Sequence, residues 1–264
     1  MAAEALFVPD GDGFRPTDAT LGPWGPTLLH GGAVSALCVL LLEELGGPEL
    51  VSTRFSIDLV RPVTVSHLDV EGKVVRTGRR LQLVEATLLS GGKLAGRASL
   101  LRLRPEPVEL PPGAPASPSL RPPPDAPEQF FDPPMLIADR PVFAGTGIEM
   151  RVPDPDRFGA GVAWFRLMLP VLPGRPGSAM ARAAAAADFG NGVSGFRGPD
   201  MAVAFPNADL TVYLSRPVEG EWVRLEATSI WGDDGIGLTH SMLADLAGPV
   251  GVAQQSLVLS PAAG

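Results

Sequence analysis

The apolar positions along the chain form two similar series, and each series predicts one buried helix followed by strands. In the first series, residues 33–45 are apolar almost all round. A helix of this kind is buried on most of its surface. His30-Gly31-Gly32 precedes this helix, and Gly46-Gly47-Pro48 ends it. Strand-like runs follow at 51–60, 67–78, 80–90 and 93–104, with the glycine and proline punctuation of an antiparallel meander.

The second series repeats this order. Ser178 is the predicted N-cap of a helix that Gly190 stops. Strand-like runs then cover residues 207–217, 220–232, 235–245 and 249–260. Asp-Asp-Gly and Ala-Gly-Pro segments separate the last three runs and predict hairpin turns.

The two series also align residue by residue. FSIDLVRPV at 55–63 lies over LTVYLSRPV at 210–218, which pairs the two Arg-Pro-Val triplets. A sheet wrapped around one apolar helix explains why the helix lacks a polar face. The pattern therefore predicts an α+β fold with two antiparallel sheets, each wrapped on its own central helix.

A proline-rich segment separates the two units. Ten of the twenty-three residues from Pro105 to Pro127 are proline. Proline fixes φ and removes the amide donor, so an extended linker is expected rather than a helix or a central strand. A ligand for an SH3-like partner is the alternative interpretation. We therefore expect an N-terminal domain at 1–104, a linker at 105–134 and a C-terminal domain at 135–264.

Composition narrows the functional classes. A net charge of −8 argues against a nucleic-acid binder, whereas 45% apolar residues suffice for a substantial core. One cysteine, Cys38, allows no internal disulfide, and no zinc-ligand spacing occurs. The N-terminus lacks a signal-peptide pattern, and the longest apolar run covers only residues 36–42. A soluble, cytoplasmic protein without a membrane span is the expectation.

Several motifs together resemble the TesB-like, type II acyl-CoA thioesterases. The matching phrases are FRP (14–16), GPWGP (22–26), HGG (30–32), IDLVRPV (57–63), AAADFGNG (185–192), NADLTVYLSRPV (207–218) and AQQSLVL (253–259). The ordered set carries the resemblance, which covers nearly the whole chain except the linker. It implies a double-hotdog fold and hydrolysis of fatty acyl-CoA without metal or other cofactor, as part of fatty acid metabolism.

The resemblance also implies a catalytic set of Asp209, Thr228 and Gln255. Thioester hydrolysis needs an activated water and a donor for the developing oxyanion. The carboxylate would orient or deprotonate the water, and the other two side chains would hold the water and the carbonyl. Strand alternation argues against the set, because Gln255 falls on the face of Ala253 and Leu257 whereas Asp209 falls with Thr211. The first unit carries Arg54 and Ser99 at the aligned positions, so one active site per chain is expected.

A second group of candidates lies at the helix ends. His30, Gly31 and Gly32 begin the first helix, where amide donors could bind a carbonyl or phosphate oxygen. The alternative is a close helix contact that only glycine permits. Asp188 at the end of the second helix could orient a water, or could simply cap the turn that follows.

Three other functions stay open. A hotdog protein that binds acyl-CoA or lipid without catalysis would not need the Asp, Thr and Gln set. A double-hotdog hydratase carries an H-x-x-x-G-x-x-x-x-P phrase, and His30 is not followed by that spacing. A structural module would explain none of the matched positions. Acyl-CoA is the expected partner, and the oligomeric state stays open, with a homodimer or a higher homo-oligomer as options.

Overall fold

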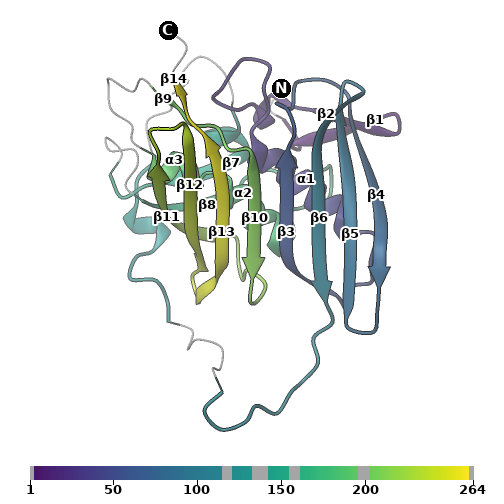
Figure 1. Cartoon of the computed structure of the whole chain (residues 1–264), viewed down its shortest axis with the longest axis vertical. Coiled ribbons are helices and arrows are strands. Elements are labelled where there is room, and N and C mark those ends of the chain that lie inside the picture. The colour runs from purple at the N-terminus through teal and green to yellow at the C-terminus, as the bar shows by residue number, and fades with distance from the viewer. Residues whose placement is uncertain (1–2, 115–120, 133–141, 155–160, 196–202, 262–264) are drawn as a thin grey trace.

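The computed structural model describes residues 3–114, 121–132, 142–154, 161–195 and 203–261. Its main feature is one continuous antiparallel sheet, with the two long helices packed behind it in the view of Figure 1. In spatial order, the strands are β1 (Phe7–Asp10), β2 (Gly13–Pro16), β4 (Leu68–Thr77), β5 (Leu81–Ser90), β6 (Lys93–Leu103), β3 (Val51–Leu59), β10 (Asp209–Leu214), β13 (Gly248–Val258), β12 (Ile236–Asp245), β11 (Trp222–Trp231), β8 (Val162–Leu167) and β7 (Ile148–Arg151). A separate pair is formed by β9 (Val203–Ala204) and β14 (Ser260–Pro261).

The two halves meet where β3 pairs with β10. Phe55 lies opposite Val212, and Ile57 lies opposite Leu210. The sequence alignment places Phe55 over Leu210 and Ile57 over Val212, so each pair maps onto the other. A local twofold axis therefore passes between Ser56 and Thr211, which face each other. This symmetric register agrees with the internal repeat predicted from the sequence.

Strand order differs from the predicted meander. Within each half, the first strand after the helix pairs with the last strand, β3 with β6 and β10 with β13. That arrangement leaves the other edge of β3 and of β10 free, and each edge satisfies its N–H and C=O groups on the other half. The expectation of two separate sheets is thereby corrected to one shared sheet. Strands β1, β2, β7 and β8 were not predicted at all.

Helices α1 (Gly31–Glu43) and α2 (Ala179–Ala187) pack against each other behind the sheet. The helices begin near His30 and Ser178, as the sequence predicts, and both residues are N-caps. The Ser178 hydroxyl accepts a hydrogen bond from the Ala181 N–H at 3.1 Å. A Cβ on Gly32 would lie 2.6 Å from the Ala185 carbonyl oxygen. Glycine therefore lets the start of α1 approach the end of α2, and the helices run antiparallel.

The proline-rich segment is exposed and has no helix or strand from residue 104 to 113. Its far end docks on the second half through Asp125, which accepts hydrogen bonds from Trp164 and Arg224 at 2.8–2.9 Å. The predicted boundaries at 104 and 134 stay predictions, and residue 134 lies outside the described residues. None of the helices in the described part of the chain has the length and apolarity of a membrane span.

Candidate functional site

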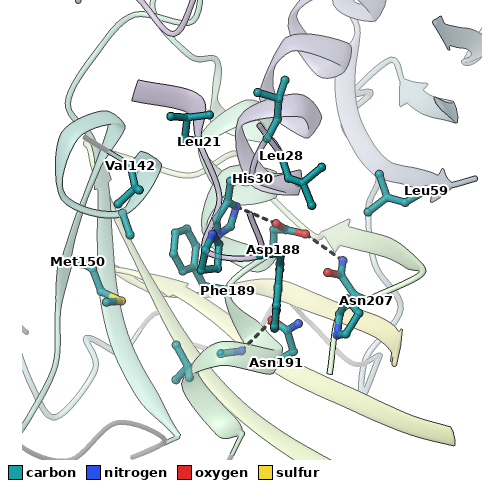
Figure 2. A pocket seen from close by; sticks show the side chains of 18 of the residues that line it. Leu21, Leu28, His30, Leu59, Val142, Met150, Asp188, Phe189, Asn191 and Asn207 are labelled. Carbon is teal, nitrogen blue, oxygen red and sulfur yellow. Dashed lines mark hydrogen bonds and ion pairs between the residues drawn. The ribbon is translucent and has the colours of Figure 1, made fainter. Parts of the chain in front are cut away.

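A cavity of about 920 Å³ opens where the two halves meet at the start of α1. Most of its lining is apolar and comes from both halves, including Leu21, Leu28, Leu59, Met150 and Phe189 (Figure 2). Polar side chains gather at one place in the wall, where His30, Asp188, Asn191 and Asn207 lie together. A few convergent polar groups in an apolar cavity are typical of a ligand site.

Asp188 is the central carboxylate of this polar group. It is the C-cap of α2, and its side chain is 4% exposed. A Cβ on Gly31 would lie 2.8 Å from both of its carboxylate oxygens. The carboxylate therefore rests against the first residue of α1, where the positive end of the helix dipole favours an anion. That contact offsets the unfavourable position of an acid at the end of α2.

His30 and Asn207 hold the two carboxylate oxygens of Asp188 (Figure 2). The His30 Nδ1 lies 2.9 Å from Oδ2, and the Asn207 Nδ2 donates to Oδ1 at 3.0 Å. The His30 ring stacks on Phe189 with 4.3 Å between ring centroids. These contacts join the start of α1, the end of α2 and the segment before β10.

Gln255 lies behind this group and is 1% exposed. Its Nε2 donates to the Asp188 carbonyl at 3.3 Å, and its Oε1 accepts from the Asn191 N–H at 3.1 Å. Gln255 thus ties β13 to the end of α2 and to the short helix α3 (Gly190–Ser194). It does not line the cavity. Its contacts fit a residue that positions Asp188.

The structure does not bring Asp209, Thr228 and Gln255 together. Thr228 is exposed on the outer face of the sheet, and Asp209 accepts a hydrogen bond from the Ser256 N–H at 2.6 Å. Neither lines the cavity. The cause is strand alternation, since the neighbouring Ala227 and Leu210 point into the core and the Gln255 side chain shares their side. The three-residue set therefore stays a prediction that no contact in the described residues supports.

The candidates at the helix ends, in contrast to the Asp, Thr and Gln set, lie mostly at the cavity. His30, Gly31 and Asp188 all line the cavity, whereas Gly32 serves the close helix contact. Sequence reasoning missed Asn207 and Asn191. Both lie in the phrases NADLTVYLSRPV and AAADFGNG that carried the resemblance, so those phrases were the available signal.

Two other reactive groups lie away from this polar group. Cys38 is buried, and burial raises its pKa to about 12, so it holds no appreciable thiolate at neutral pH. Asp12, His67 and Asp69 present ligand-type atoms within 4.8 Å of one another near the β1–β2 hairpin. Among the described residues this is the group with the spacing of a metal site, and it does not line the cavity.

Family models match both halves of the chain. A model described as the acyl-CoA thioesterase N-terminal domain matches residues 20–103, and one described as the C-terminal domain matches residues 115–259. No curated protein matches the chain by sequence.

Solved structures of similar fold cover almost the whole chain. The acyl-CoA thioesterase II TesB2 of Mycobacterium marinum has a TM-score of 0.64 at 14% identity, with 97% of this chain and 94% of that chain covered. The tesB protein of Mycobacterium avium subsp. paratuberculosis has a TM-score of 0.66 at 15% identity, with 97% and 96% covered. A protein of unknown function with a hot dog fold from Alicyclobacillus acidocaldarius has a TM-score of 0.69 at 18% identity, with 97% of each chain covered. At these identities the likeness establishes the hotdog fold.

Proposed function

We propose that the reaction of this chain, which belongs to the acyl-CoA thioesterase family, takes place at Asp188 in the cavity between the two halves. As a member of this family, the protein is a thioester hydrolase. The proposal concerns the residues that act and the groups of the substrate that they meet. It also interprets the two related halves as a double hotdog, which the twofold β3–β10 register supports.

The observation that carries the proposal is the placement of the Asp188 carboxylate. It is buried, lines the cavity and is held at both oxygens by side chains from other elements. A carboxylate fixed in this way can orient a water and accept its proton without first reorganising its surroundings. Asp209 lacks these features, and we therefore transfer the predicted role from Asp209 to Asp188.

The start of α1 supplies a donor for the developing oxyanion. Gly31 lines the cavity, and its N–H has no hydrogen-bond partner among the described residues. An unpaired amide in the first turn of a helix points out of the helix end and is strengthened by the helix dipole. We assign the thioester carbonyl oxygen to this amide, so that negative charge develops beside it during attack.

The reaction then balances within the cavity. The water oxygen forms a bond to the thioester carbon while one water proton passes to the Asp188 carboxylate. The tetrahedral species collapses with cleavage of the C–S bond, and the departing thiolate takes the proton back. The products are a carboxylic acid and free coenzyme A, and Asp188 ends as it began. No nucleophilic side chain is required, which fits the burial of Cys38.

The apolar lining suits the acyl chain. Leucine, valine, methionine and phenylalanine side chains surround the polar group on both sides of the half-to-half boundary. Burial of an acyl chain there is favourable by roughly 0.8 kcal/mol for each methylene group removed from water. Arg61 also lines the cavity and is exposed, so it can meet an anionic part of the substrate.

The test is release of free thiol from a panel of acyl-CoA esters from acetyl to palmitoyl. Wild-type protein should hydrolyse at least one of them. Asp188→Asn keeps the shape of the side chain but removes its basicity, so kcat should fall by at least about a hundredfold. Binding of a non-hydrolysable acyl-CoA thioether should survive, because the lost interaction belongs to the transition state.

Asp209→Asn and Thr228→Val are the matched controls, because both residues lie outside the cavity. Both variants should keep most of the wild-type rate. Near-normal turnover in Asp188→Asn together with a large loss in Asp209→Asn would reverse the assignment. Binding of the thioether without thiol release from any ester would favour the non-catalytic acyl-CoA or lipid-binding alternative.

A further inference from the structure

The His30 Nδ1 makes two contacts that demand opposite protonation states. It accepts a hydrogen bond from the Gly32 N–H at 3.1 Å, as the N-cap of α1. It also lies 2.9 Å from the Asp188 Oδ2. One ring nitrogen carries either a lone pair or a proton. A lone pair satisfies Gly32 but leaves two acceptors facing each other unless Asp188 carries the proton.

Two arrangements of one proton resolve the conflict. With the proton on Asp188, the neutral carboxyl group donates to His30, and the Gly32 N–H keeps its acceptor. With the proton on His30, the ring donates to the Asp188 carboxylate, and the cap contact to Gly32 weakens. The heavy atoms hardly move between the two states, because the stacked Phe189 fixes the ring.

The surroundings favour exchange of the proton within this pair. The His30 ring also lies against Phe143, at 5.1 Å between centroids, so it contacts two aromatic side chains. Asp188 is the charged side chain in contact with it. The other charged groups that line the cavity are Arg61, Asp132, Glu149 and Arg166, and Glu149 is bound to Arg166 and Arg151.

We propose that His30 is the positioning residue that shares a proton with Asp188 and keeps this carboxylate ready to act as the base. The inference rests on the proposed function for its kinetic consequence. In the arrangement that reacts, the shared proton is on His30, and Asp188 is a carboxylate that can accept a proton from water. After C–S cleavage the accepted proton leaves with the thiolate, so the pair returns to one shared proton.

Nitrogen NMR of the imidazole rings tests the shared proton without reference to catalysis. The chain has three histidines, His30, His67 and His240, so assignment by single substitution is practical. In wild-type protein, the Nδ1 signal of His30 should lie between the values of a protonated and an unprotonated nitrogen. In Asp188→Asn the amide can donate but cannot accept and return a proton, so Nδ1 should become fully unprotonated.

An unchanged His30 signal in Asp188→Asn would overturn the shared proton, whatever the enzyme hydrolyses. Asp209→Asn is the matched carboxylate control and should leave the His30 signal as in wild type. Because this readout needs no substrate, failure of the proposed function and failure of the proton-sharing pair give different results.

The kinetic test uses His30→Asn. Asparagine is a favoured N-cap, so the Gly32 contact and the helix are kept while the titrating ring is lost. We expect kcat to fall by about ten- to a hundredfold, less than on removal of the base itself, with KM near wild type.

His240→Asn, on β12 away from the cavity, is the control and should keep the wild-type kcat and KM. A purely structural role of His30 would lower the melting temperature and leave kcat of the folded variant unchanged. A folded His30→Asn enzyme with wild-type kcat would therefore overturn the kinetic part of the proposal.

Discussion

Arg175 and Glu44 form an ion pair at the end of the helix pair that lies opposite His30 and Asp188. The twofold relation between the halves would place a second site at this end. Counted from the N-caps, Ser178 corresponds to His30 and Leu40 corresponds to Asp188. The second position therefore lacks both the ring and the carboxylate. Among the described residues, the polar group therefore occurs at one end of the helix pair.

One ligand should therefore bind per chain. Calorimetric titration with a non-hydrolysable acyl-CoA thioether is expected to give a single site in wild-type protein. A stoichiometry of two equivalent sites would contradict the asymmetry of the halves, and Leu40 and Ser178 would then need another explanation.

Gly31→Ala should damage the reaction while leaving the fold intact. The added Cβ would lie 2.8 Å from both Asp188 carboxylate oxygens, so the carboxylate must move. Alanine is a better helix former than glycine by about 1 kcal/mol, so α1 itself should not suffer. We expect a fall in kcat of at least about tenfold, since misplacement by about 1 Å can cost about a hundredfold.

The control is Gly78→Ala, where the added Cβ would meet its nearest neighbour, the Leu81 carbonyl oxygen, at 3.6 Å. This variant should keep the wild-type rate. Equal rates for both variants, with unchanged melting temperatures, would show that Asp188 does not need the close approach to Gly31.

Asp245→Asn should destabilise the second half. The Asp245 side chain is fully buried and bound by Arg216 at 2.5 and 2.6 Å, so the substitution removes the close anionic partner of this guanidinium and leaves Glu219 at 3.9 Å. Removing one member of a buried pair costs about 3–5 kcal/mol. Chemical denaturation should show this loss, whereas Asp233→Asn, at an exposed turn, should stay within about 0.5 kcal/mol of wild type.

The Asp245 carboxylate also makes the stability of the protein sensitive to acid. Burial alone would raise the pKa of Asp245, but hydrogen bonds from Arg216 and from the backbone of Glu219 and Ala247 outweigh burial and lower it. Its stabilising effect is therefore fully present above the unfolded value of about 3.9 and is lost as the pH falls through the lower, folded value. The difference in stability between wild type and Asp245→Asn should shrink in that range.

His67 should make the N-terminal hairpin sensitive to pH in the opposite sense. Hydrogen bonds to Asp10 and then Asp69 raise the pKa of His67, and these contacts join the β1–β2 hairpin to β4. The stabilisation is complete below the unfolded value of about 6.5 and is lost as the pH rises through the higher, folded value. Amide exchange in residues 7–16 should therefore quicken at high pH.

His67→Gln should remove this pH dependence, and the exchange rates, corrected for the intrinsic effect of pH, should then be the same at both ends of the range. The His240→Asn variant should exchange as the wild type does. A wild-type hairpin whose corrected exchange does not respond to pH would contradict the role of the His67 contacts.

The sequence by itself determined the two long helices, the four strands that follow each of them, and the repetition of this order. Local signals suffice for these features, since His30 and Ser178 as N-caps, the glycines after each helix and the prolines after Leu103 act on their own neighbours along the chain. The repeat was visible because both copies of the Arg-Pro-Val strand kept the same alternation. That alternation also predicted that Gln255 and Asp209 face opposite sides of the sheet.

Only the tertiary structure decided which carboxylate lies at the site. Asp188 and His30 are far apart in sequence and meet because α1 and α2 pack antiparallel, a contact that depends on glycines in one helix and alanines in the other. Asn207 reaches Asp188 because the segment before β10 lies along β13, where Asn207 is opposite Leu257. No local sequence pattern predicts the contacts of Asp188 with His30 and Asn207. Helix crossing and strand pairing are set by the burial of whole helix and sheet faces, not by the individual residues that come into contact.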